Sequence, residues 1–297
     1  MLACNQNERM IFIVIQHAKQ TTLIKKYWDL YESKKELSYL VKPSMPIMYF
    51  GNIKKYLESP IRIVTVGLNP SRRDFPEPDP FQRFQSMKQD HYYHFNQQYI
   101  SALNQYFDDD PYNAWYNPAF ENILNGLDAS FYNRKENTAL HTDICTPLAT
   151  NPTWGDLTKE AKMDLQTTGV PLWHELIDYL EPDIILISAA GEHLSKIQFE
   201  TVKDWETIYT SPRDKPYLIN SKQVKLSSGK TSSIYFGRAS ELPFGLVGEE
   251  EKFIIGKHIK TITEKLKNPA AFMPFIHPGL EVEGEDGDIF GWGEKVQ

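Results

Sequence analysis

The sequence predicts an α/β fold, and three observations support this prediction. The chain has 297 residues, 41% of them hydrophobic, which is enough to bury the core of one large domain. Residues 61–66 form an apolar, β-branched run that stops at a Gly-x-Asn-Pro-Ser turn, as a buried strand of a parallel sheet does. Helical spacing of apolar residues recurs before and after this run, so helices are expected to pack on the sheet.

The other elements follow in order along the chain. Leu23, Ile24, Tyr27 and Leu30 recur at helical spacing and predict an amphipathic helix over residues 21–40. A long loop rich in Pro, Phe and charge is expected over residues 72–89. Further helices are predicted over residues 91–107, 119–127, 170–180, 192–197 and 249–266. Short strands are predicted over residues 202–209, 223–226 and 232–236, with a turn at 227–230.

The turn after the first strand is the best candidate for a functional site. Ligands of open α/β sheets bind beyond the carboxyl ends of the strands, so Asn69 is expected to lie at a cleft. Gly67 allows a close backbone approach, Pro70 stiffens the turn, and the Asn69 amide offers both a donor and an acceptor. Taken alone, the motif also fits an ordinary junction between a strand and a turn.

The motif resembles the first signature of the uracil-DNA glycosylase superfamily, in the Gly-x-Asn-Pro version of its mismatch-specific and single-strand-selective members. The remaining strands of the family pattern have candidates in the right order, at residues 138–148, 182–191 and 232–240. The resemblance implies a three-layer αβα fold around a central, mainly parallel four-stranded sheet. It divides the chain into an N-terminal helical segment (1–59), the glycosylase-like domain (60–267) and an acidic C-terminal extension (268–297).

The resemblance also implies an activity, that of a DNA glycosylase. Such an enzyme flips a nucleotide out of DNA and hydrolyses its N-glycosidic bond, leaving an abasic site. It implies DNA as the partner, and neither a metal nor another cofactor. Asn69 would orient the water, since an amide is no strong general base, and Asp143 and Arg238 complete the predicted catalytic set. The predicted base pocket comprises Gly67, Leu68, Pro70, Ser71, Phe75 and His141. The predicted DNA contacts are Arg72, Arg73, Ser240 and Leu242.

Two departures from the family pattern bear on the substrate. Ser71 stands where the uracil-specific pattern has a Tyr that closes off position 5 of the pyrimidine. Asp143 stands where the family usually has a uracil-reading Asn, and a carboxylate accepts from the N4 amine of cytosine but repels O4 of uracil. Together they predict a cytosine that is hydroxymethylated or glucosylated at position 5, as in some phage genomes, and hence a role in antiviral defence. Asp143 also fits a turn cap, or a partner of His141 or of an Arg.

The last predicted loop departs from the family as well. Arg238 replaces the His of the family's His-Pro-Ser motif, and a permanent cation could stabilise the leaving base or grip a phosphate. Ser240 matches the phosphate-contacting Ser, and Leu242 could wedge into the duplex. A rival match, His277-Pro278-Gly279, follows the final helix rather than a strand. Phe75, Phe81 and Phe84 are candidates for stacking on the base or for packing in the loop.

Other functions remain open alternatives. An ordinary uracil or mismatch repair glycosylase fits the same motif, and so does a non-catalytic DNA-sensing module. The segment Gly229-Lys230-Thr231 resembles the end of a phosphate-binding loop, but Val224 replaces the required Gly and a strand follows, so no nucleotide cofactor is expected. A nuclease-like metal site at His91, His94 and residues 108–110 lacks a third ligand placed by spacing.

Composition restricts the remaining properties. Two cysteines exclude a disulfide framework and a four-cysteine metal cluster. A net charge of −7 argues against an extended, charge-driven nucleic-acid binder and allows a compact footprint. The apolar patch at residues 10–15 is too short to span a bilayer, so a cytoplasmic location without membrane contact is expected. The protein is also expected to be a monomer.

Overall fold

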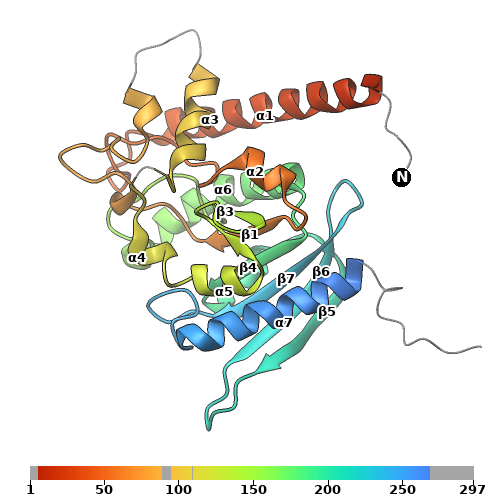
Figure 1. Ribbon diagram of the computed structural model, residues 1–297. Coiled ribbons are helices and arrows are strands. Elements are labelled where there is room, and N and C mark those ends of the chain that lie inside the picture. The colour runs from red at the N-terminus through yellow and green to blue at the C-terminus, as the bar shows by residue number, and fades with distance from the viewer. Residues whose placement is uncertain (1–5, 89–94, 109, 268–297) are drawn as a thin grey trace, which may run out of the picture.

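A seven-stranded mixed sheet runs through the centre of the protein (Figure 1), whose computed structural model describes residues 6–88, 95–108 and 110–267. In spatial order, the strands are β2 (Ala129–Ser130), β3 (Asn137–Asp143), β1 (Ile63–Gly67), β4 (Ile184–Ala189), β7 (Thr231–Arg238), β6 (Leu218–Lys225) and β5 (Glu200–Thr210). The first five run parallel, and β6 is antiparallel to both of its neighbours. β1 and β4 are completely buried and rich in Ile and Val, as expected for parallel strands covered on both faces.

The α/β class is confirmed, but the prediction of a four-stranded sheet was wrong. The four predicted strands do form the parallel centre, β3-β1-β4-β7. The sheet is larger because β2 adds a short edge beside β3, and the hairpin β5–β6 extends the other side from β7. None of the β5 residues is buried, so this strand lacks the apolar pattern that marks a core strand.

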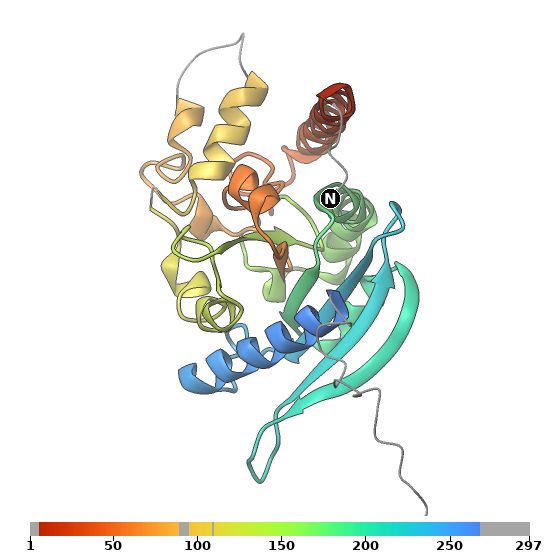
Figure 2. The same ribbon diagram turned by 45° about the vertical axis from the view of Figure 1, so that its right-hand side comes forward.

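Helices cover both faces of the sheet, as Figures 1 and 2 show. Trp173 of α6 (Lys159–Leu180) donates its indole N–H to Thr142 Oγ1 at 3.0 Å, whereas Thr263 of α7 (Glu249–Lys267) lies 3.3 Å from the Tyr235 hydroxyl. Thr142 and Tyr235 occupy register positions of opposite parity, so they point to opposite faces. α6 and α7 therefore lie on different sides of the sheet.

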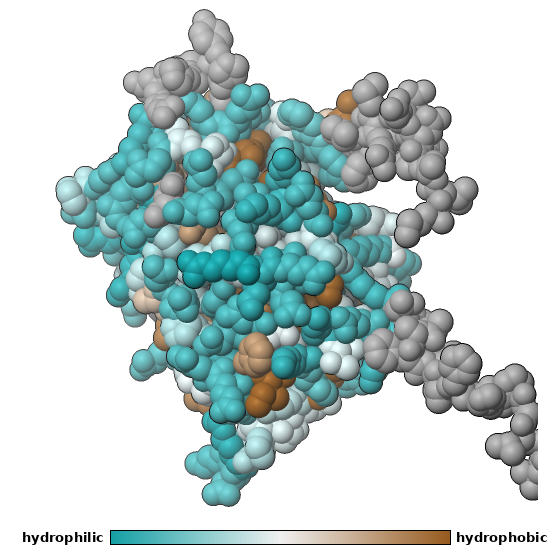
Figure 3. Space-filling view, viewed as in Figure 1, coloured by the Kyte–Doolittle hydropathy of each residue, from teal (hydrophilic) through white to brown (hydrophobic). Residues whose placement is uncertain are grey.

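The N-terminal helix α1 (Gln6–Lys34) begins earlier than predicted and packs against α6. Leu23, Ile24, Tyr27 and Leu30 are buried, as their spacing predicts, and Lys26 forms an ion pair with Glu175 of α6. No helix in the described part of the chain is long and apolar enough to cross a membrane. On the face seen in Figure 3, hydrophobic residues form small separate spots within a hydrophilic surface.

Short elements fill the crossover between β1 and β3 and the loops after the strands. These elements are η1 (Arg72–Asp74), η2 (Gln85–Lys88), α3 (Phe95–Gln105), α4 (Asn113–Tyr116), α5 (Glu121–Gly126), η4 (Trp154–Asp156) and η5 (Gly191–Lys196), besides α2 (Ile53–Glu58) before β1. The predicted helix at 192–197 is thus the 3-10 turn η5. His91, His94 and the motif at 277–279 lie outside the described residues.

Candidate functional site

A cavity of about 550 Å³ opens at the carboxyl edge of the sheet, where β3, β1, β4 and β7 end side by side. It lies where open α/β sheets bind their ligands. Its polar lining comprises Asn69, Ser71, Arg73, Asp74, His141, Asp143, Ser188, His193, Ser240 and Glu241, among others. The structure therefore brings most of the predicted site residues into one hollow.

Asn69 lies on the cavity wall with its amide group held in one orientation. Its Nδ2 donates to the Pro70 carbonyl oxygen at 2.6 Å and to Thr150 Oγ1 at 2.9 Å. The carbonyl partner can only accept, which assigns the amide nitrogen to this side. Among the described residues no group donates to Oδ1, so the carbonyl oxygen of the amide remains available to a water or a ligand.

Asp143 ends β3 beside His141, and both side chains are buried against Gly67. Asp143 Oδ1 lies 3.7 Å from His141 Nε2, and His141 Nδ1 lies 2.7 Å from the Thr65 hydroxyl. A Cβ atom on Gly67 would stand only 2.5 Å from Asp143 Oδ1, so the absence of a side chain makes room for the carboxylate. The site thus has a buried acceptor at its base, and the predicted pairing of Asp143 with His141 is observed as well.

Ser71 caps the short helix η1, a role that the sequence did not indicate. Its Oγ accepts from the Arg73 N–H at 3.1 Å, and its own N–H donates to Asp74 Oδ2 at 2.8 Å. The Tyr106 hydroxyl donates to the other Asp74 oxygen at 2.7 Å. Burial raises the pKa of Asp74 against these hydrogen bonds, which lower it. Asp74 lines the cavity and fixes the turn that carries Ser71.

The remaining residues of the first motif divide between wall and core. Leu68 and Pro70 line the cavity, as predicted. Phe75 does not: it is 1% exposed and stacks on Phe84 with the ring centroids 5.2 Å apart. It belongs to an aromatic cluster under the loop, because the turn of η1 directs its side chain inward. Stacking of Phe75 on a ligand in the cavity is therefore excluded by its position.

The two arginines after the motif are exposed near the mouth of the cavity. Arg73 lines the cavity and lies over the Tyr112 ring, 5.1 Å from its centroid. Arg72 points elsewhere, with its guanidinium 3.6 Å from the exposed carboxylate of Glu77. Both cations are accessible to solvent, as the prediction of DNA contacts requires.

Arg238 is not among the residues that line the cavity, so the structure does not bring it together with Asn69 and Asp143. It is exposed at the end of β7, directly after Gly237, which pairs with the cavity-lining Ser188. Its register partner is Ala189 of β4, which lines the cavity, but Arg238 itself is not among the lining residues. Ser240 and Leu242, which follow on the loop, do line the cavity, and the Leu242 side chain is 40% exposed.

Several lining residues were missed by the sequence analysis. Aromatic rings from other segments line much of the cavity, namely those of Phe50, Tyr112, Trp115, Tyr116 and Trp154. Ser188 is the second-last residue of β4, and its Oγ accepts from the Phe244 N–H at 2.7 Å. His193 follows on η5, and its side chain is 9% exposed. The sequence position of His193 could have indicated that it lines the cavity, because it stands four residues after the end of β4, as Ser71 stands four residues after the end of β1.

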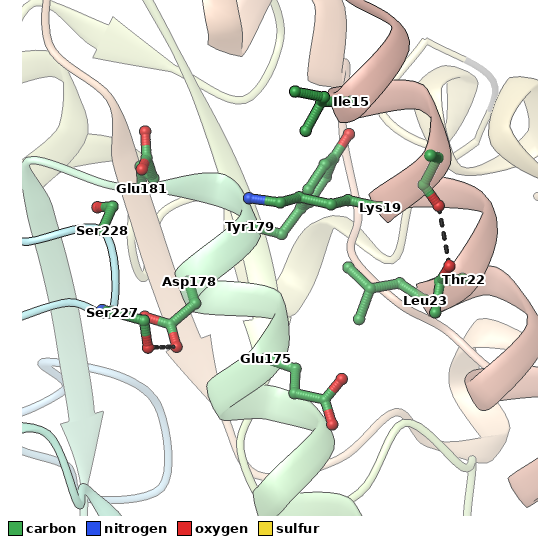
Figure 4. Close-up of a pocket in the computed structure, with 11 residues that line it drawn as sticks. Ile15, Lys19, Thr22, Leu23, Glu175, Asp178, Tyr179, Glu181, Ser227 and Ser228 are labelled. Carbon is green, nitrogen blue, oxygen red and sulfur yellow. Dashed lines mark hydrogen bonds between the residues drawn. The ribbon is translucent and has the colours of Figure 1, made fainter. Parts of the chain in front are cut away.

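A second cavity, of about 570 Å³, lies between α1, α6 and the β6–β7 turn (Figure 4). Its polar groups hold the elements together: Asp178 accepts from the N–H of Ser227 at 2.9 Å, and Thr22 donates to the Ala18 carbonyl at 2.9 Å. It lies at the amino edge of the sheet, because Ser227 precedes β7 and Glu181 precedes β4. The carboxyl-edge cavity is therefore the better candidate for a ligand site.

Comparisons with known proteins add no relative to this picture. The sequence matches no known protein family, and no curated protein is significantly similar to it. Within residues 6–88, 95–108 and 110–267, no group of three or more His, Cys, Asp or Glu side chains could hold a metal ion. The functional argument therefore depends on the residues of the carboxyl-edge cavity.

Proposed function

We propose that the protein is a DNA glycosylase, which flips a base into the carboxyl-edge cavity and hydrolyses its N-glycosidic bond. The observation that carries this proposal is the convergence of Asn69 and Asp143 in one cavity, at the ends of neighbouring strands. An amide with an available oxygen can orient a water, and a buried carboxylate can read an amino group. Orienting the water and reading the base are the two tasks that selective hydrolysis of a nucleoside requires.

The chemistry divides between these two residues. Asn69 Oδ1 accepts a hydrogen bond from the attacking water, and the bonds of Nδ2 to Pro70 and Thr150 keep the amide from turning away. Asp143 accepts from the exocyclic amine of the base, and its carboxylate lies 3.7 Å from His141 Nε2. Flipping the nucleotide costs a few kcal/mol, and stacking of the base on aromatic side chains that line the cavity offsets this cost.

The size of the cavity and the side chain of Ser71 favour a cytosine that is modified at position 5. A volume of about 550 Å³ exceeds what a single pyrimidine needs, so it can accept a hydroxymethyl or glucosyl group on the base. Ser71 is small, and its hydroxyl turns back to the Arg73 N–H. Since some phage genomes carry such cytosines, the proposed setting is antiviral defence.

The test is abasic-site formation, read by alkaline cleavage of duplexes carrying cytosine, hydroxymethylcytosine, glucosylated hydroxymethylcytosine or uracil. We expect cleavage of a modified cytosine, with Asn69→Ala slower by on the order of 100-fold. Asp143→Asn should lose the preference for cytosine over uracil by a similar factor. Asp214→Asn, a change at an exposed position on the β5–β6 turn, is the matched control.

Two other outcomes would favour the alternatives. Cleavage of uracil alone would point to a repair glycosylase. The absence of Arg238 from the residues that line the cavity favours a second candidate, a non-catalytic DNA-sensing module, because it removes one predicted charge-stabilising group from the site. Tight binding of a modified duplex without abasic sites would support that candidate.

A further inference from the structure

Tyr106 is a fully buried residue that lies behind the wall of the carboxyl-edge cavity without lining it. It directly follows α3, and its ring packs against Phe50 with the centroids 4.6 Å apart. Its hydroxyl donates to Asp74 Oδ1 at 2.7 Å and accepts from the Tyr112 N–H at 3.3 Å. Asp74 and Tyr112 both line the cavity. A single buried hydroxyl therefore joins two segments of the cavity wall.

Asp74 connects this hydroxyl to the first motif. Its other oxygen, Oδ2, accepts from the Ser71 N–H at 2.8 Å. Burial raises the pKa of Asp74, and the bonds from Ser71 and Tyr106 lower it, so both bonds favour the carboxylate form. Arg83 also lowers this pKa through its charge, but its Nε and Nη1 are buried without a hydrogen-bond partner in the described part of the chain. The direction of the carboxylate is thus set by its bonds to Ser71 and Tyr106.

The Ser71 N–H belongs to the same peptide unit as the Pro70 carbonyl group, and that carbonyl holds Asn69. A peptide unit is planar, so the bond from the Ser71 N–H to Asp74 fixes the direction in which the Pro70 oxygen points. This oxygen accepts from Asn69 Nδ2 at 2.6 Å. Three hydrogen bonds and one rigid peptide unit thus join the Tyr106 hydroxyl to the Asn69 amide in an unbroken chain.

We infer that Tyr106 is a positioning residue that sets the orientation of the Asn69 amide through Asp74 and the Pro70–Ser71 peptide. Asn69 Oδ1 orients the attacking water only under the proposed glycosylase function, on which this inference rests. Without the Tyr106 hydroxyl, Asp74 has one donor fewer, so its carboxylate and the peptide that it holds can turn. The Asn69 amide then turns as well, and its oxygen no longer aligns the water with C1′. A misplacement of about 1 Å at a reacting centre costs roughly 100-fold in rate.

The first test compares Tyr106→Phe with Tyr99→Phe by single-turnover excision from a duplex that the unsubstituted protein cleaves. Tyr99 is a matched control, because it is equally buried and its hydroxyl donates to the Pro46 carbonyl oxygen at 2.9 Å, away from the cavity. Each variant loses one buried hydroxyl, so we expect similar, small decreases in unfolding temperature. Only Tyr106→Phe should slow excision, by about 10- to 30-fold, with duplex affinity unchanged within about threefold. Equal excision rates for the two variants would contradict the inference.

A double-mutant cycle with Asn69→Ala separates positioning from general support of the fold. If Tyr106 acts through Asn69, its hydroxyl has nothing to position once the amide is removed. Tyr106→Phe should therefore slow the Asn69→Ala variant by no more than about twofold, although it slows the unsubstituted protein by about 10- to 30-fold. An equal loss in both backgrounds would show that Tyr106 acts by another route and would overturn the assignment.

Hydrogen exchange at the Ser71 amide tests the coupling without any measurement of activity. This N–H is bonded to Asp74, so loss of the Tyr106 hydroxyl should speed its exchange by on the order of 10-fold. Tyr99→Phe should leave the exchange rate of this amide unchanged. NMR resolves the amide and measures the rate in both variants. Unchanged exchange in Tyr106→Phe would show that Tyr106 does not hold the turn.

The outcomes separate the two proposals. If the unsubstituted protein cleaves a duplex and Tyr106→Phe fails any of these three tests, the assignment of Tyr106 is wrong and the glycosylase proposal stands. If the unsubstituted protein cleaves none of the duplexes, the glycosylase proposal fails, and the role of Tyr106 in orienting the water fails with it. Exchange at Ser71 then decides by itself whether Tyr106 holds the turn.

Discussion

At the scale of single residues, Gly67 controls the position of the Asp143 carboxylate. A Cβ atom there would lie 2.5 Å from Asp143 Oδ1 and 2.9 Å from His141 Nε2. His141 is packed among aromatic rings, with the Tyr116 centroid 5.2 Å away, so the imidazole has little room to move. Asp143 borders the cavity and can be displaced into it. A glycine is therefore required at this point to keep the acceptor against the cavity wall.

Under the proposed glycosylase function, Gly67→Ala should accordingly reduce base excision without unfolding the protein. We expect a 10- to 100-fold lower rate, as a displacement of about 1 Å causes at a reacting centre, and a loss of stability of about 1–2 kcal/mol. The measurement is the excision rate together with thermal unfolding. Gly248→Ala is the control, because a Cβ there meets no atom within 4 Å. An unchanged excision rate would show that the position of Asp143 is unimportant.

The residue scale also shows what a sequence can predict about a site. Asn69, Ser71 and Asp143 were predicted to belong to one site and do line one cavity, because all three stand at or shortly after the carboxyl ends of the adjacent strands β1 and β3. Arg238 is not brought together with them in the cavity lining, because its position at the end of β7 depends on the pairing of β7 with β4, which chain order does not reveal. His193 was missed because burial without a partner is a property of the folded structure.

At the scale of elements, Asp183 joins three parts of the amino edge of the sheet. It precedes β4, accepts from the Arg62 N–H at 2.8 Å, and lies 2.9 Å from both Lys230 of the β6–β7 turn and Lys267 at the end of α7. Burial raises the pKa of Asp183, but the Arg62 N–H and the two ammonium groups outweigh it and hold the pKa below its ordinary value. The carboxylate form is thus favoured by folding.

Asp183→Asn should therefore destabilise the protein in a pH-dependent way. A lowered pKa contributes stability above the unfolded value of about 3.9, and this contribution is lost as the pH falls through the folded value. We expect a deficit of about 2 kcal/mol at pH 7 that shrinks below pH 4. Urea unfolding at several pH values measures it, with exposed Asp214→Asn as the control. A deficit that is constant with pH would contradict the ionic explanation.

The elements themselves were predictable in proportion to their periodicity. Apolar spacing predicted α7, the second half of α6 (residues 170–180) and the four central parallel strands, whereas α6 itself begins at Lys159. Helix boundaries were predicted less accurately. The predicted start of α1 was too late, since the helix begins at Gln6. Exposed apolar residues in its N-terminal turns, such as Val14 and Ile15, blur the amphipathic pattern there. The sequence could not show that β5 and β6 belong to the main sheet, because local sequence patterns do not reveal that β6 pairs with β7.

At the scale of the whole molecule, the acidic balance limits the DNA footprint that the proposed function can have. With a net charge of −7, attraction to phosphates must come from few local cations, of which Arg73 is the one that borders the cavity beside the first motif. Each neutralised phosphate contributes about −0.9 to the slope of log K against log salt. A compact footprint of two or three contacts thus gives a slope of about −2 to −3.

Arg73→Gln should reduce the magnitude of that slope by about 0.9, because one phosphate contact is lost. Fluorescence anisotropy with a labelled duplex at several salt concentrations measures the slope. Lys54→Gln, on the exposed side of α2 before the amino end of β1, should leave it unchanged. Equal slopes for the Arg73 variant and the unsubstituted protein would remove Arg73 from the interface.

The order of the strands also has a consequence for synthesis on the ribosome. β7 is the last strand within the described residues, yet it lies between β4 and the hairpin β5–β6. The hairpin is translated first and has nowhere to attach until residues 231–238 emerge. The walls of the cavity are equally incomplete before residues 239–242 are made. A nascent chain that has not reached residue 242 therefore lacks part of the cavity wall, and the cavity can be complete only after that residue has been made.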